Sequence, residues 1–205
     1  MNSILLSPFA LIIFVITIII SLYALFFDNR LLNSFILRPY YLFREKKYYT
    51  LITSGFIHAD LNHLIFNMLT FFFFAFYLEN YIGHWQFVIL YFVSMIVSDL
   101  PSVFKNKDNE VYGSLGASGA ISAVVFSFIL YNPFSKIYIM FIPIGIPAIL
   151  YAFCYLAYCI YASKKQYNNV NHSAHFWGAI SGVVLTIILD PRSIFIFLQK
   201  FNINL

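Results

Sequence analysis

Apolar stretches without charged residues recur along this 205-residue chain, and short segments with charge, proline or glycine separate them. A helix needs about 20 apolar residues to cross a hydrocarbon layer about 30 Å thick. The pattern predicts an all-α membrane protein in which one domain, residues 1–205, forms a bundle of six transmembrane helices. The expected helices are 4–27, 61–78, 83–104, 115–131, 137–162 and 174–189.

Proline interrupts the fifth predicted helix near its start, at Pro143 and Pro147. Proline removes a backbone donor and disfavours the helical conformation at the residue before it. Part of residues 137–147 is therefore expected to be a loop or a bent beginning of the helix.

The first apolar segment, 4–27, is longer than the core of a signal peptide and has neither a basic start nor a small-residue cleavage site. We therefore expect it to be retained as a membrane helix. The long loop that follows it combines basic residues with many aromatic ones. Such a segment is expected to lie in the membrane interface.

Composition supports a membrane protein, because 61% of the residues are hydrophobic and only 10% are charged. Soluble domains carry about 25% charged residues, and the deficit leaves too few to cover a surface that faces water. The formal net charge is +4, but the basic residues are spread over loops that flank the membrane. We therefore expect contacts with the lipid bilayer and its headgroups, and none with nucleic acid.

Two cysteines, Cys154 and Cys159, lie five residues apart on the fifth apolar segment. At this spacing they point to different sides of a helix, and neither has a partner for a disulfide. Both are expected to be reduced residues that serve packing.

Strongly polar side chains are rare inside the predicted helices, where each is costly and is a functional candidate by default. His63 and Asn67 share one face of the second helix. Ser118 lies near the start of the fourth helix, and His175 lies near the start of the sixth. Because these three helices run in the same direction, the four side chains are expected to meet in one layer of the membrane.

Together these side chains have the chemistry of acyl transfer. The imidazole of His175, with an ordinary pKa near 6.5, can accept the hydroxyl proton of Ser118 near neutral pH. His63, Asn67 and the backbone N–H of Ser118 can then donate hydrogen bonds to an oxyanion. We expect no metal ion.

Small residues occur where the two helices that carry Ser118 and His175 would cross. Gly119 follows the serine, and Gly178 and Gly182 lie beyond the histidine. Such residues allow helix backbones to approach closely in membranes. Gly116 allows an unusual backbone turn before the serine.

These residues resemble the rhomboid family of intramembrane serine proteases. The resemblance rests on "TSGFIHADLNHLIFNM" (53–68), "YLENYIG" (77–83), "GASGAISA" (116–123) and "AHFWGAISG" (174–182), in this order. It implies a six-helix bundle, a catalytic dyad of Ser118 and His175 without a third acid, and an oxyanion hole of His63, Asn67 and the Ser118 amide. It also implies that no cofactor is needed and that the substrates are single-span membrane proteins, cut in or near their own membrane helix. The fifth helix is then expected to lie beside a lateral entrance.

The chain departs from the family pattern at Ser122, where some members carry an aromatic residue beneath the histidine ring. Support for His175 must then come from elsewhere, and Trp177 is one candidate. The chain is expected to be the minimal six-helix form without an additional helix or soluble domain.

Charge and resemblance disagree about orientation in the membrane. Bacterial members of this form keep the N-terminus in the cytoplasm, which places the site towards the outside of the prokaryotic plasma membrane. That orientation puts only three basic residues inside and nine outside, against the positive-inside rule. We follow the resemblance.

Four other interpretations are a helix-packing motif, a metal site, a transporter and a catalytically silent protein of the same family. The small residues around Ser118 are also typical of simple helix packing, and four histidines near one surface suggest a metal site: His58, His63, His172 and His175. A transporter would carry polar residues through the full depth of the bundle. A catalytically silent rhomboid-like protein, which binds membrane segments for quality control or trafficking, typically lacks the serine or the histidine, and this chain has both.

Overall fold

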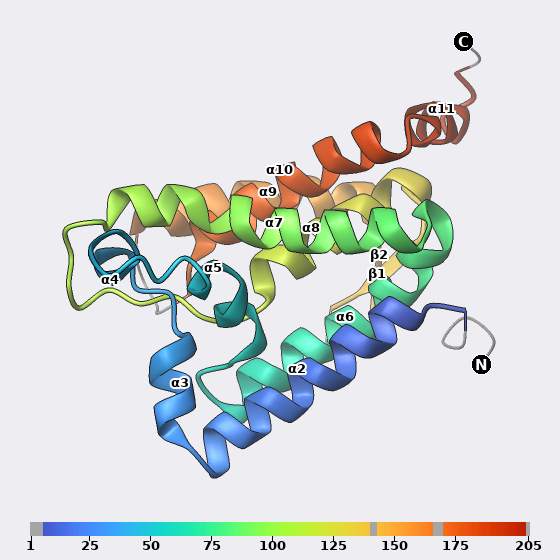
Figure 1. Cartoon of the computed structure of the whole chain (residues 1–205). Coiled ribbons are helices and arrows are strands. Elements are labelled where there is room, and N and C mark those ends of the chain that lie inside the picture. Colours follow the sequence, from blue (N-terminus) through green and yellow to red (C-terminus); the bar gives the residue numbers. More distant parts are fainter. Residues whose placement is uncertain (1–5, 140–142, 166–169, 204–205) are drawn as a thin grey trace.

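The computed structural model describes residues 6–139, 143–165 and 170–203. Its main helices run along one another as a bundle, with α2 beside α6, and α7 lying across α8 and α10 (Figure 1). The long helices are α2 (Pro8–Phe26), α6 (Leu61–Ile82), α7 (His84–Lys105), α8 (Ser118–Tyr131), α9 (Ala148–Lys165) and α10 (His172–Leu189). Short elements complete the described fold: α3 (Asn29–Phe35), α4 (Pro39–Arg44), α5 (Thr50–Thr53), the 3₁₀ turn η1 (Ser54–Phe56), β1 (Lys136–Tyr138), β2 (Gly145–Pro147) and α11 (Arg192–Gln199).

Within the described residues, four helices are long and apolar enough to cross a membrane: α2, α6, α7 and α10. The apolar helix α8 has 14 residues, which corresponds to a length of about 21 Å. The fold is thus a helical membrane bundle. The crossing of α8 and α9, and with it the count of six transmembrane helices, stays a prediction.

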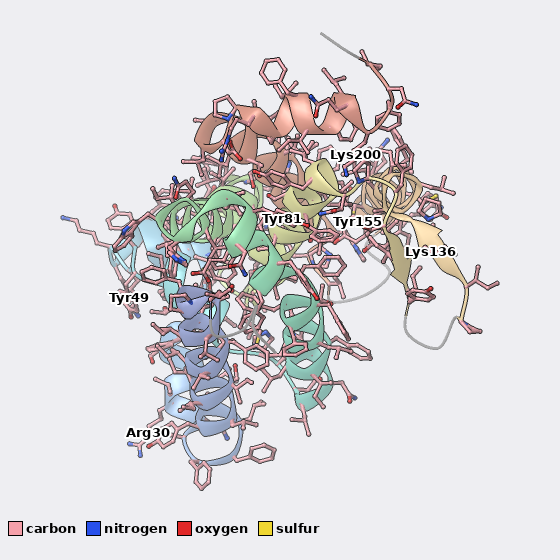
Figure 2. The ribbon with its side chains drawn as sticks, turned by 90° about the vertical axis from the view of Figure 1, so that its right-hand side faces the viewer. Arg30, Tyr49, Tyr81, Lys136, Tyr155 and Lys200 are labelled. Carbon is pink, nitrogen blue, oxygen red and sulfur yellow. The ribbon has the colours of Figure 1, made fainter. Side chains whose placement is uncertain are left out.

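The bounds 137–162 begin the fifth helix too early, and the interruption expected within residues 137–147 is a strand pair rather than a loop or a bent beginning of the helix. Residues 136–138 and 145–147 pair as an antiparallel hairpin, with Ile137 opposite Ile146, and α9 begins only at Ala148. Lys136 marks the start of this hairpin in Figure 2. The physical reason is Pro147, which ends β2 and fits immediately before a helix but not inside one. Residues 140–142 of the expected helix, and residues 4 and 5 of the first, lie outside the described residues.

The acidic motif at the end of α6 fixes the start of α2. Glu79 is fully buried, and its carboxylate accepts hydrogen bonds from the backbone N–H of Phe9 at 3.3 Å and of Ala10 at 2.7 Å. His84 Nδ1 lies 2.6 Å from the same carboxylate. A carboxylate at the amino end of a helix satisfies free N–H groups and opposes the positive end of the helix dipole. Glu79 therefore joins α2 to the corner between α6 and α7.

The central helix of the bundle is α8, which packs against α6, α7, α9 and α10. At the two glycines of α10, its contact with that helix is between backbones. A Cβ atom added at Gly178 would overlap the carbonyl of Gly119, and one added at Gly182 would overlap the backbone of Ala123. The two helices lie as close as helices without intervening side chains can lie.

Ser118 lies deeper in the bundle than the end of the neighbouring helix α7. Gly119 packs directly against the side chain of Ser98, which is seven residues before the end of α7 at Lys105. Seven residues of helix correspond to about 10 Å. The chain after α7 accordingly turns back along the bundle before α8 begins (Figure 1).

Replacement of Gly178 or Gly182 by alanine should force α8 and α10 apart. Overpacking of this kind costs about 1–3 kcal/mol of the free energy of unfolding, so the midpoint of thermal unfolding in detergent should fall for each variant. Val184→Ala changes an exposed position on the same helix and should leave the midpoint unchanged. Equal midpoints for the glycine variants and the control would contradict the close contact.

Candidate active site

Ser118 is the first residue of α8, and the segment before it is held from two sides. Leu37 and Ser114 exchange backbone hydrogen bonds of 3.0 and 2.9 Å, and the N–H of Gly116 donates to the carbonyl of Ser54 at 2.9 Å. Gly116 has φ +103°, a conformation that favours glycine. A Cβ atom at this position would also lie 2.6 Å from the His63 ring. Glycine is therefore required both by the turn and by the imidazole beside it.

The structure brings Ser118 and His175 together. Ser118 Oγ and His175 Nε2 lie 2.8 Å apart, although 57 residues separate them in the sequence. His175 is in the first turns of α10, and the side chain of Asn171 caps this helix by accepting from the N–H of Ala174 at 3.1 Å. The hydroxyl and the imidazole are within ordinary hydrogen-bond distance.

Asn171 also ties the start of α10 to neighbouring segments. Its amide oxygen accepts from Ser102 Oγ at 3.0 Å, and its amide nitrogen donates to the hydroxyl of Tyr112 at 3.3 Å. Ser114 Oγ in turn donates to the buried carboxyl of Asp99 at 3.4 Å. These bonds fix the first turn of α10, and hence His175, relative to α7 and to the loop that precedes Ser118.

His63 and Asn67 occupy the first two turns of α6. Asp60 caps this helix by accepting from the N–H of His63 at 2.8 Å. The His63 ring faces Gly116, two residues before the serine. Asn67 is buried, and its amide nitrogen donates one of its two protons to the carbonyl of His63 at 2.9 Å. One N–H of the Asn67 amide thus remains for a further acceptor.

His58, in the loop between η1 and α6, packs against His63, with ring centroids 4.9 Å apart in an edge-to-face arrangement. The hydroxyl of Ser21 donates its single proton to the carbonyl of Phe56, so it accepts from His58 Nδ1 at 2.9 Å. Burial, with a smaller contribution from His63, lowers the pKa of His58 to about 3. His58 is therefore a neutral residue that fixes the loop.

The aromatic ring beside His175 comes from α9. The Tyr155 ring is parallel to the imidazole within 10°, with centroids 6.4 Å apart. Its hydroxyl shares a 2.8 Å hydrogen bond with Ser122 Oγ, and Figure 2 shows Tyr155 where α9 meets α8. Trp177 is 42% exposed, and its ring contacts Phe176. The sequence did not identify Tyr155 as a residue of the site. The only signal for it was Ser122, which carries a hydroxyl at the position where some family members have an aromatic ring.

The four histidines form two pairs. His58 contacts His63, and His172 lies edge-to-face with His175 at 5.9 Å between centroids. Among the described residues, the group whose ligand atoms lie close enough for a metal ion is instead Cys159, His172 and His175. The expected absence of a cofactor is not tested by this geometry.

Comparison with known proteins agrees with the resemblance noted in the sequence. The family model of the Rhomboid domain matches residues 45–192. RHOMBOID-like protein 12 of Arabidopsis thaliana, a mitochondrial protein, is 28% identical over 153 residues, with 67% of this chain and 45% of the relative covered. Rhomboid protein 1 of Saccharomyces cerevisiae, also mitochondrial, is 30% identical over 151 residues, with 70% and 44% covered.

A bacterial relative is matched over a larger share of its length. YdcA of Bacillus subtilis, provisionally named a rhomboid protease, is 28% identical over 142 residues, with 69% of this chain and 67% of the relative covered. In contrast, the chain spans less than half the length of the two mitochondrial relatives.

Loss of the Tyr155 ring should leave the His175 imidazole less well oriented towards Ser118. We expect Tyr155→Ala to slow phosphonylation of Ser118 by a fluorophosphonate reagent about tenfold or more, since misplacement of a reacting group by about 1 Å can cost 100-fold in rate. Tyr155→Phe and Ser122→Ala, which remove only the hydrogen bond, should have smaller effects.

The matched control is Tyr161→Phe, at an exposed position of the same helix, and the measurement is the rate of labelling of purified protein. The role of the ring is refuted if Tyr155→Ala labels as fast as this control.

Proposed function

The chain belongs to the rhomboid family, and we propose that it is an intramembrane serine endopeptidase that cleaves transmembrane segments of membrane proteins. The observation that carries this proposal is the distance of 2.8 Å between Ser118 Oγ and His175 Nε2 in a membrane bundle. A serine hydroxyl is a weak nucleophile unless a base accepts its proton. In this site the base is within reach.

The proposed reaction begins with the neutral imidazole of His175, with its lone pair on Nε2 and its proton on Nδ1. As Ser118 Oγ attacks the carbonyl carbon of the substrate, its proton passes to Nε2. The imidazolium then gives this proton to the leaving amine, and an acyl-enzyme ester remains on Ser118. A water molecule, deprotonated by the same nitrogen, hydrolyses the ester and restores the hydroxyl.

Three donors are proposed to stabilise the oxyanion of this reaction. The Ser118 N–H belongs to the first turn of α8, where backbone donors lack acceptors within the helix, and no side chain of the described residues caps this end. The dipole of α8 adds positive potential at the same point. The side chains of His63 and Asn67 are the other two donors in the proposal, and the remaining Asn67 N–H suits this role.

The position of Ser118 suits a substrate that is itself in the membrane. The hydroxyl lies about 10 Å below the end of α7, a depth at which a soluble chain would have to enter the bundle. A transmembrane segment can instead approach sideways, and we propose that it does so beside α9. Only a locally unwound segment exposes its carbonyl carbon to attack, because a helix keeps its backbone groups paired in lipid.

The protein is a multi-pass integral membrane protein. Its membrane and orientation are part of the proposal: a prokaryotic plasma membrane with Ser118 towards the extracytoplasmic side. Single-span membrane proteins are the proposed substrates.

Ser118→Ala and His175→Ala should each reduce cleavage of a single-span reporter in detergent or liposomes by at least about 1000-fold, because members of a catalytic unit fail together. Ser163→Ala, at the end of α9, is the control and should cleave as the unchanged protein does. Cleavage that survives either dyad substitution would disprove the assignment. Binding of the reporter without cleavage by the unchanged protein would favour the catalytically silent alternative.

Asn67→Ala should lower kcat about 100-fold while changing KM little, because its donor acts on the transition state. Thr70→Ala alters a half-buried position one turn further along α6, where the hydroxyl donates to the carbonyl of Phe66 in the same helix at 2.9 Å, and it should retain full activity. The readout is the separation of kcat from KM in the reporter assay. A rise in KM at constant kcat would assign Asn67 to substrate binding instead.

A further inference from the structure

We propose that Cys159, His172 and His175 form a binding site for a thiophilic divalent cation such as Zn²⁺, and that its occupation inhibits the protease. The inhibition rests on the proposed function, whereas binding of the cation does not. The site shares His175 with the proposed dyad and adds Cys159 and His172, which have no role in that dyad.

The three residues converge from two helices. His172 and His175 are three residues apart on α10 and therefore lie on the same face. Cys159 comes from α9 and is fully buried against them. One potential ligand atom from each residue lies within 4.8 Å of the other two. In the described residues no other group of His, Cys, Asp and Glu meets this criterion.

The distances are close to those of an occupied site. With Zn–N of about 2.1 Å and Zn–S of about 2.3 Å, tetrahedral coordination places the ligand atoms about 3.4 to 3.6 Å apart. Since the ligand atoms lie within 4.8 Å of one another, they need to move together by at most about 1.3 Å, a distance that rotation of the side chains can supply.

The donor set selects the class of metal. One thiolate and two imidazoles suit Zn²⁺ and related soft or borderline ions, whereas Mg²⁺ and Ca²⁺ require oxygen ligands. Three protein ligands leave the fourth tetrahedral position for water. On binding, the thiol of Cys159 loses its proton to a water molecule that arrives with the hydrated ion, and the sulfur forms the bond to the metal.

Occupation of the site removes the base of the dyad. A neutral imidazole has one nitrogen with a lone pair and one with a proton. If the metal binds Nδ1 of His175, the proton must reside on Nε2, which then cannot accept a proton from Ser118. If the metal binds Nε2, it displaces the Ser118 hydroxyl from that nitrogen. In both cases the serine loses its activation.

Binding is tested with Co²⁺, which replaces Zn²⁺ and gives a charge-transfer absorption band when a cysteine thiolate is a ligand. The titration uses the full chain with Ser118→Ala, which keeps all three ligands and cannot turn over substrate. We expect the band in this protein and its loss on addition of Zn²⁺.

Adding Cys159→Ser should remove the band and weaken binding at least about tenfold, since even outer-shell substitutions cost 10–100-fold in metal affinity. His172→Gln should weaken binding in the same way. Cys154→Ser, at the exposed cysteine of the same helix, should change nothing. A band that persists in Cys159→Ser, or no saturable binding, would overturn the proposed site.

Inhibition is tested by titrating Zn²⁺ into the reporter assay, with each variant compared with its own rate in the absence of metal. We expect inhibition that a chelator reverses, and an inhibitory concentration at least about tenfold higher for Cys159→Ser than for the unchanged protein or Cys154→Ser. Equal inhibition of these three proteins by Zn²⁺ would overturn the proposed inhibition through this site. If the unchanged protein proved inactive, the proposed function would fail while the Co²⁺ titration still decided the metal site.

Discussion

The contact between the backbones of α8 and α10 is the constraint on which the rest of the site depends. Gly178 and Gly182 carry no side chain where they meet Gly119 and Ala123, so the two helix axes can lie close together. The side chains of Ser118 and His175 can meet only if their helices lie close together. This crossing allows Ser118 Oγ and His175 Nε2 to lie 2.8 Å apart. A side chain of any size at the crossing would act directly on that distance.

Two further sets of contacts fix the loop before Ser118 and the first turn of α10. The loop before Ser118 is tied to residues 37 and 54 by backbone hydrogen bonds, and the first turn of α10 is tied to α7 through Asn171. At the far end of the bundle, Glu79 fixes α2 to α6. The serine and the histidine are thus each anchored independently of the hydrogen bond between them, as a preorganised site requires.

Much of this arrangement can be read from the sequence, because the membrane imposes simple rules. Helix length and the cost of polar groups in lipid locate α2, α6, α7 and α10, and the common direction of alternate helices places Ser118 and His175 in one layer. The short hairpin before α9 could not be predicted in the same way. A few apolar residues between prolines fit a strand, a loop or a helix start equally well.

The contributions of α9 are also hidden in the sequence. This helix is rich in aromatic and aliphatic residues on all sides, so no stripe of polar residues reveals its rotation about its axis. That rotation decides that Tyr155 meets Ser122 and that Cys159 meets His172, whereas Cys154 faces outwards. Prediction of these pairs requires the packing of side chains between helices, which periodicity does not contain.

The depth at which α8 begins has a consequence for selectivity. The hydroxyl of Ser118 is fixed about 10 Å deeper in the bundle than the end of α7. A transmembrane segment is held at a defined depth by the polar residues at its two ends, so the serine reaches only the bonds that lie at one depth of that segment. For a protease of the proposed kind, the bond that is cut would be chosen as much by its distance from the membrane surface as by the side chains beside it. Moving a susceptible segment by one helical turn, about 5.4 Å, would carry its scissile bond out of register without altering a residue next to it.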